Sequence, residues 1–158
     1  MVLSNVRRGT EASTKLYQEL GDLAQDEEIK EVLNARAFIS ESILKRLDEC
    51  FRIIGAQPTK PEGKLQEIFV EDFRRELAAI ESPEAKRLFV LIKASHLMHM
   101  RAGEYLALIA AADLTGHHAV GALLETCLAD KAALVERTRR LIRERVGQRL
   151  AKATASLS

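Results

Sequence analysis

The chain has no tryptophan and few other aromatic residues, and this scarcity is its first informative feature. Aromatic residues make up 4% of its 158 residues, and proline occurs only at Pro58, Pro61 and Pro83. Residues that favour strands are too few for an all-β protein, whereas Ala, Leu, Glu, Arg and Lys are abundant and favour helices. The composition therefore predicts an all-α protein, and the length predicts a single domain over residues 1–158.

A large excess of one charge and a long apolar run are also missing. The chain carries 24 Lys and Arg against 23 Asp and Glu, so its overall charge indicates neither a nucleic acid nor a membrane surface as partner. No apolar run approaches the roughly 18 to 20 residues of a membrane span, and the N-terminal stretch MVLSNVRRGTEA lacks the apolar core of a signal peptide. We therefore expect a cytoplasmic protein with no membrane partner.

Cysteine is scarce as well. Cys50 and Cys127 fall on apolar helical stripes without CxxC spacing, which predicts buried, reduced thiols in place of a disulfide framework or a zinc site. The sequence contains no GxSxG motif and no glycine-rich phosphate loop. Nucleophilic catalysis is therefore not indicated.

Residues that begin and end helices divide the chain into four long helices and one short helix. Asp26 and Ser82 are suitable N-caps, and Gly55 and Gly116 are suitable helix ends. The predicted helices cover residues of about 3–24, 26–54, 65–80, 83–114 and 117 to beyond 146, with a loop at 55–64 and a frayed tail at about 152–158. Short turns pair the long helices into two antiparallel hairpins. We expect a four-helix bundle whose additional short helix joins the hairpins and allows a crossover connection.

The long helices have apolar seams that polar residues interrupt. The predicted seams are Ile29, Leu33, Arg36, Ser40, Ile43, Leu47, Cys50 and Ile54 in the second helix; Leu88, Ile92, Ser95, His99, Ala102, Leu106 and Ile109 in the third long helix; and Val120, Leu124, Cys127, Lys131, Leu134, Thr138 and Leu141 in the last. The first helix places Leu16, Tyr17, Leu20 and Leu23 on one side, with Thr10 and Ser13 inward and Glu11 adjacent. At about 1.5 Å of rise per residue, the interruptions lie at similar heights. Polar groups from all four helices are therefore expected to meet at one level.

Two stretches resemble the YciE/YciF family of bacterial ferritin-like proteins. They are LKRLDECFRIIGAQP, residues 44–58, and LIKASHLMHMRAGEYLALIAAADLTGHHAVGALLETCLADKAAL, residues 91–134. With the helix lengths, the resemblance covers nearly the whole chain. It implies a ferritin-like four-helix bundle, a cytosolic location and a role in the stress response.

The resemblance also implies that most metal ligands have been substituted. Family members usually carry acids at the positions of Met98 and Arg101 and a pair of acids at Asp130 and Lys131. The family's His and Glu of the second helix correspond to Arg36 and Ile39, and its first-helix Glu falls near Thr10 or Glu11. A dinuclear site needs about four carboxylates and usually two histidines, whereas Arg36, Arg101 and Lys131 would repel a cation. We therefore expect no cofactor, with a di-iron or di-manganese centre as the alternative.

Two interpretations of the polar residues remain open. The weak metal candidates are Glu11, His96, His99 and Asp130, of which His96 and His99 are spaced so that both can face one ion. The other interpretation is a polar network in place of the metal, formed by Arg36, Ser40, His99, Arg101, Glu104, Asp130 and Lys131. Buried charges require partners, so we expect contacts from these cations to carboxylates on other helices unless they reach solvent.

Two surface features bear on partners. The last helix ends in ERTRRLIRERVGQRLAK, a basic stretch that could attract an anion or nucleic acid, although no aromatic residues are interleaved to stack on bases. Apolar residues outside the seams, namely Phe38, Phe69 and Phe73, predict a homo-oligomer, for which a dimer is the simplest form. The leading hypothesis is a non-catalytic structural or interaction protein that has lost a di-metal centre.

Overall fold

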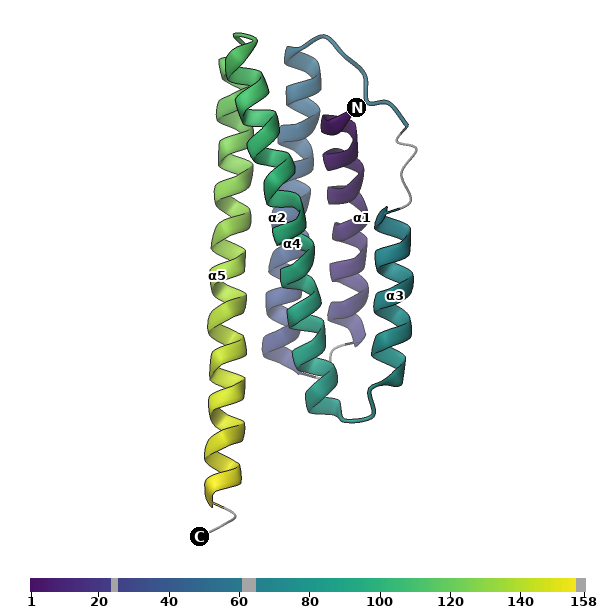
Figure 1. Ribbon diagram of the computed structural model, residues 1–158, viewed down its shortest axis with the longest axis vertical. Helices are drawn as coiled ribbons and strands as arrows, with labels where there is room; N and C mark the ends of the chain where they lie inside the picture. Colours follow the sequence, from purple (N-terminus) through teal and green to yellow (C-terminus); the bar gives the residue numbers. More distant parts are fainter. Residues whose placement is uncertain (24–25, 61–64, 156–158) are drawn as a thin grey trace.

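Five helices make up the part of the chain that the computed structural model describes, which is residues 1–23, 26–60 and 65–155 (Figure 1). They are α1 (Val2–Leu23), α2 (Glu27–Ile53), α3 (Leu65–Ala79), α4 (Pro83–Leu114) and α5 (His118–Ala155). The all-α prediction is therefore confirmed, and the predicted helix bounds are correct to within a few residues. Residues 152–155, which were predicted to belong to a frayed tail, instead continue α5, and residues 156–158 lie outside the described part.

The four long helices form a bundle in which α1 contacts α2 and α4, and α5 contacts α2 and α4. Figure 1 shows α1 and α5 running downward and α2 and α4 running upward, so every contacting pair of long helices is antiparallel. The connection from α2 to α4 crosses the bundle and includes α3, which lies alongside as a fifth helix. This is the crossover arrangement of ferritin-like bundles. None of the described helices is both long and apolar enough to cross a membrane.

The helix ends follow from the residues that cap them. Asp26 accepts a hydrogen bond from the backbone N–H of Ile29 at 3.1 Å, and Ser82 accepts one from the N–H of Ala85 at 3.4 Å. Gly55 and Gly116 adopt positive φ angles of 65° and 77°, which only glycine tolerates at little cost, and they follow the ends of α2 and α4. These four positions are the ones that the sequence predicted.

The seams of α2 and α5 are confirmed, except that Ile54 is exposed at the end of α2 and Lys131 of α5 is half-buried. The seam of α4 was wrong by one residue, because His99 and Leu106 lie on the outer surface. The buried positions of α4 are Leu91, Ala94, Leu97, Met98, Tyr105 and Ala112. This helix has apolar residues on both sides, so its periodicity alone does not say which side faces the bundle.

Two apolar clusters fill the bundle, one at each end. Leu16, Tyr17 and Leu20 lie in the cluster that α3 covers, whereas Leu47, Cys50 and Cys127 lie in the other. The side chain of Leu23, predicted to share this face of α1, lies outside the described residues. Phe73 is buried and stacks on Phe89, and Phe69 packs against the same cluster, so these two rings need no second subunit to cover them. Phe38 remains 73% exposed.

Asp26 provides a test of how α2 begins and how α5 is held against it. Its carboxylate caps α2 and also forms an ion pair with Arg145 of α5 at 2.9 Å. We expect Asp26→Ala to lower the free energy of unfolding by about 1–2 kcal/mol, because cap and ion pair are both lost. Asp26→Asn keeps the cap and should cost less than half as much. Urea unfolding of both variants checks this, and equal losses would show that the ion pair dominates.

Candidate functional site

The centre of the bundle contains a buried arginine. Arg36 of α2 is 0% exposed and is the largest fully buried side chain described. Its guanidinium donates hydrogen bonds to the sulfur of Met98 on α4 and to the hydroxyl of Thr138 on α5, and a further one to the carbonyl oxygen of Leu134 at 3.3 Å. One side chain of α2 therefore connects to both helices of the other hairpin.

Arg36 also contacts the first helix, since its guanidinium carbon lies 5.6 Å from the ring centroid of Tyr17. Burial lowers the pKa of Arg36, and the nearby Tyr17 opposes that effect. Burial likewise raises the pKa of Tyr17, which Arg36 opposes. The Nε of Arg36 has no hydrogen-bond partner within the described part of the chain, and no carboxylate there forms an ion pair with it. The cation is held by a ring face and neutral acceptors, which are weaker partners than a carboxylate.

A second cation lies at the same centre. The ammonium of Lys131 on α5 sits 5.5 Å from the ring centroid of Tyr105 on α4. The pKa of Lys131 is lowered to about 8, mainly by burial and also by Arg101 and Arg36, while Cys127 and Glu104 act in the opposite direction. Burial also raises the pKa of Tyr105 well above its usual value, and the neighbouring Thr10 opposes this. Lys131 thus shares one electrostatic environment with two arginines.

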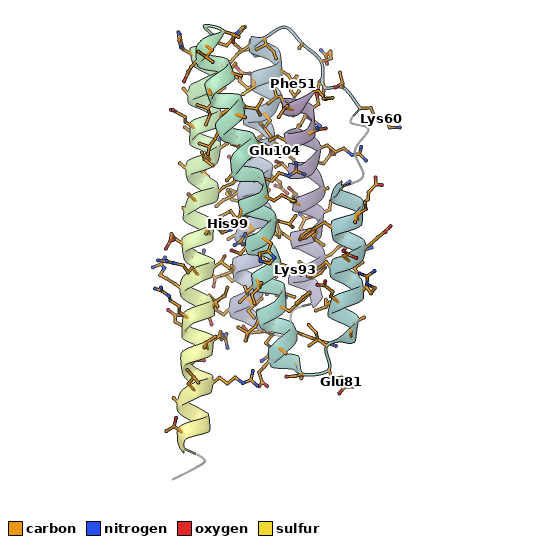
Figure 2. The ribbon with its side chains drawn as sticks, in the orientation of Figure 1. Phe51, Lys60, Glu81, Lys93, His99 and Glu104 are labelled. Atoms are coloured by element: carbon orange, nitrogen blue, oxygen red, sulfur yellow. The ribbon has the colours of Figure 1, made fainter. Side chains whose placement is uncertain are left out.

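The third cation, Arg101, lies between α1 and α4. Its side chain is 11% exposed and forms an ion pair with Glu104, one turn further along α4, at 2.7 Å. The guanidinium lies directly against Gly9 of α1, where the Cβ of any other residue would overlap with it. Glycine at this position therefore allows the arginine to enter the interface between the helices. Figure 2 shows Glu104 and His99 at successive levels along α4.

The residues singled out as metal candidates are not gathered at one point. Glu11 is exposed and lies 3.7 Å from Arg7, and His96 is exposed. His99 is exposed too, with its Nδ1 2.9 Å from the carbonyl oxygen of Ser95. Asp130 forms an ion pair with Arg46 of α2 at 2.5 Å. Within residues 1–23, 26–60 and 65–155, no three His, Cys, Asp or Glu side chains lie together in a way that could hold a metal ion.

Arg46 is the residue that the sequence reasoning missed. It connects α2 to α5 through Asp130 and approaches the sulfur of Cys127 to 4.0 Å. It lies ten residues after Arg36 and outside the predicted seam, so only the spatial pairing of α2 with α5 identifies it. Ser40, the other predicted polar member on α2, is buried.

Both cysteines are free thiols buried in the core, as predicted. The pKa of Cys50 is raised to about 11, mainly by burial and also by the nearby Cys127. Burial also raises the pKa of Cys127, although Arg46 and Lys131 lower it. A thiol with a raised pKa carries little thiolate at neutral pH and is a poor nucleophile. Cys50 and Cys127 therefore contribute to the packing of the core.

The positions at which the family resemblance implies ligands do converge in the structure. Arg36 contacts Met98, and Lys131 interacts electrostatically with both Arg36 and Arg101. A divalent cation at this point would meet three positive side chains and one carboxylate, Glu104, which already pairs with Arg101. The donor set present therefore does not fit a di-iron or di-manganese centre.

The basic end of α5 is partly neutralised within the chain. Arg137 forms an ion pair with Glu31, and Arg145 forms ion pairs with Asp26 and Glu28, at distances of 2.6 to 2.9 Å. Arg139 pairs with Glu136 on the same helix at 3.2 Å. The ion pairs to α2 help to hold α5 against the first hairpin, which weakens the case for a dedicated anion or nucleic-acid site.

Substitutions at Arg36 distinguish packing from charge. Met is similar in length to Arg. Replacing Arg36 leaves no carboxylate without a partner, because none of the described carboxylates pairs with it. The Thr138 hydroxyl keeps its own hydrogen bond to the Leu134 carbonyl at 2.8 Å. We expect Arg36→Met to be neutral or to stabilise the fold by about 1–2 kcal/mol, whereas Arg36→Ala should cost about 2–4 kcal/mol through the cavity it leaves. Guanidinium unfolding measures both. A large loss in Arg36→Met would mean that the cation itself is required.

Lys131 gives the site a pH dependence. A folded-state pKa of about 8, below the ordinary 10.5, means that the unfolded chain binds more protons between these values. The contribution of Lys131 to stability therefore rises with pH across this window. We expect Lys131→Met to be more stable than the wild type by about 1–2 kcal/mol at pH 7, with the difference shrinking toward pH 10.5. Because only the difference between the two proteins is used, titration of Cys50 and the tyrosines cancels, whereas Cys127, whose pKa Lys131 lowers, contributes to the difference. A difference that is constant with pH would contradict this.

Comparison with known proteins agrees with this geometry. The fold matches the crystal structure of the E. coli stress protein YciF with a TM-score of 0.86 at 16% sequence identity, over 92% of each chain. It also matches YcfI, described as "a putative structural protein from Rhodopseudomonas palustris", with a TM-score of 0.82 at 18% identity, over 87% of this chain and 88% of that one.

No curated protein sequence matches the chain. The model of one family, a domain of unknown function called DUF892, matches residues 3–151. The ferritin-like fold and the resemblance to YciE/YciF proteins are thereby confirmed, and the chain belongs to the DUF892 family.

Proposed function

We propose that this chain is a non-catalytic ferritin-like bundle that serves as a structural or interaction protein, in which a cluster of cationic side chains replaces a di-metal centre. The observation that carries the proposal is the side chain of Arg36, fully buried and bonded to Met98 and Thr138 at the level where the resemblance implies metal ligands. Lys131 and Arg101 add two more cations there. A site of this charge is suited to holding four helices in one register, not to binding Fe²⁺ or Mn²⁺.

The proposal includes the setting in which the protein acts. Similarity to YciF, which is described as a stress protein, supports a role in the stress response. Two free buried thiols are what a reducing compartment allows, which supports a cytoplasmic location. The protein would act as a homodimer, which would cover exposed apolar residues such as Phe38.

Metal analysis of protein purified without a histidine tag tests the proposal. After incubation with Fe²⁺, Mn²⁺ or Zn²⁺ and gel filtration, we expect less than about 0.1 metal ion per chain and no rise in melting temperature, because a metal that binds only the folded state must stabilise it. Near-stoichiometric metal would overturn the proposal in favour of a ferroxidase-like or other di-metal protein.

Two variants show where any bound metal is held. Asp130→Asn and His99→Ala remove the candidates closest in type to the family's ligands. If the wild type retained metal and both variants lost it, the two side chains would have to converge on binding, away from the Arg46 ion pair and the exposed position that they have now. Metal retained in both variants would instead indicate adventitious surface binding.

A further inference from the structure

A cavity of about 520 Å³ lies between α3 and the bundle, where α1 ends and α4 begins. Its walls come from four helices: the last turn of α1, the first turn of α2, the last turns of α3 and the first two turns of α4. Figure 2 shows one of the lining residues, Glu81, in the turn that connects α3 to α4. The cavity is as large as the sites that hold small molecules, which measure about 300–1,000 Å³.

Most of the residues around this cavity are aliphatic. Six of the ten lining residues have no charge, no hydrogen-bonding side chain and no aromatic ring, namely Leu20, Ile29, Leu77, Ala78, Pro83 and Val90. Leu20 and Ile29 belong to the core cluster that α3 covers, and Leu77 and Val90 pack against that cluster. The cavity therefore reaches the apolar core. Water in such a space lacks hydrogen-bond partners, so an apolar group that enters would gain contacts.

The other four lining residues are charged, and three of them are cations. They are Arg74, Lys86 and Arg87, with Glu81 as the acid. Arg74 forms an ion pair with Glu19 of α1 at 2.8 Å. Lys86 and Arg87 form no ion pair with a carboxylate in the part of the chain that the structure describes. None of the described lining residues offers a neutral hydrogen-bonding side chain, which a sugar or a nucleobase would need.

Arg87 also borders a second cavity of about 200 Å³, on the side of α4 that faces α5. The two cavities share Ile29 and Arg87, so this arginine lies at the boundary between them. Arg145 and Arg149 of α5 line the second cavity together with the acid Glu84. The Nε of Arg145 is buried and has no hydrogen-bond partner among the described residues, although its Nη2 forms ion pairs with carboxylates before and within α2. The cationic lining thus continues past Arg87.

We propose that the larger cavity binds a single-chain fatty acid, with the acyl chain among the aliphatic residues and the carboxylate at Arg87 and Lys86. The ligand and the lining divide in the same way, into a long aliphatic part and one charged end. When the ion pairs of Arg74 and Arg145 are set aside, the two cavities are left with three cations and two acids, an excess that favours an anionic head group. Arg87 is half-buried, where water weakens its attraction to a carboxylate less than at an exposed position.

Calorimetric titration of the delipidated protein with fatty acids of increasing length tests the proposal. Dodecanoate should bind with a Kd of about 1–100 µM. From octanoate to decanoate to dodecanoate, each added pair of CH₂ groups should lower the Kd about 15-fold, because one buried CH₂ contributes about 0.8 kcal/mol. A Kd for dodecanoate above about 1 mM, or a Kd that does not change with chain length, would overturn the proposal.

Ala78→Trp fills the cavity from α3. Ala78 is exposed and lines the cavity, so the indole should occupy the space of the acyl chain and raise the Kd for dodecanoate at least about tenfold. Ala79→Trp is the matched control, because Ala79 is the next residue of α3, is also exposed and does not line the cavity. The control should stay within about twofold of the wild type. An unchanged Kd in Ala78→Trp, or equal weakening in both variants, would overturn the site.

Arg87→Gln separates recognition of the carboxylate from burial of the acyl chain. It leaves no described acid without a partner and should weaken binding of dodecanoate at least about fivefold. Dodecanol has the same chain without the charge, so its Kd should change by less than about twofold. Arg140→Gln removes the same charge from an exposed position of α5 outside both cavities and should leave both ligands unaffected. Equal weakening of dodecanoate and dodecanol by Arg87→Gln would overturn the assignment of the carboxylate to Arg87.

A membrane lipid is the other source of an acyl chain. We expect no sedimentation of the protein with vesicles of phosphatidylglycerol. If the protein did sediment with them, Ala78→Trp prevented it and dodecanoate did not bind, a membrane lipid would replace the fatty acid as the ligand and overturn the proposal. The inference is independent of the proposed function: stoichiometric metal would overturn that function and leave the fatty-acid site in place, and failure of dodecanoate to bind would do the reverse.

Discussion

The bundle depends on one constraint, which is that a full positive charge must be accommodated in its centre. Arg36 cannot be left without partners at zero exposure, because desolvating an unpaired cation costs several kcal/mol. Every long helix contributes to meeting this requirement: Tyr17 from α1, Met98 from α4, and Thr138 with the Leu134 carbonyl from α5. A slip of any helix by one residue would remove a partner. The cation therefore specifies the register of the helices, even though an apolar residue of the same shape could stabilise them more.

The remaining cations follow from the same geometry. Once Arg36 occupies the centre, Lys131 and Arg101 repel it, and each is displaced to its own neutral or acidic neighbour. Lys131 lies over Tyr105, and Arg101 lies against Gly9 and binds Glu104. Three buried cations would be stabilised by a carboxylate that contacts all of them. None of the described carboxylates does so. The three cations form neighbouring pairs and not one network.

Much of this could be predicted from the sequence, and the failures have physical causes. The caps at Asp26 and Ser82 and the glycines at the ends of α2 and α4 act locally, so their positions could be predicted directly. The seams of α2 and α5 were correct because each has one apolar side. The seam of α4 was not, because Leu91 and Ile92 are both apolar and periodicity cannot choose between them. Pairs such as Arg46 with Asp130 depend on which helices become neighbours and on how each helix is rotated about its axis. The spacing of residues along one helix carries no information about either.

The contact between Arg101 and Gly9 limits how this site can change over evolution. A larger residue at position 9 would require the guanidinium of Arg101 to move, and a smaller residue at position 101 would leave a gap between α1 and α4. A carboxylate introduced alone at position 36 would be neutralised by Lys131 and Arg101 before it could coordinate anything. Descendants of this sequence would need several coordinated replacements to acquire a dinuclear centre. The close packing of Arg101 on Gly9 thus couples these two positions, so that a change at one of them favours a change at the other.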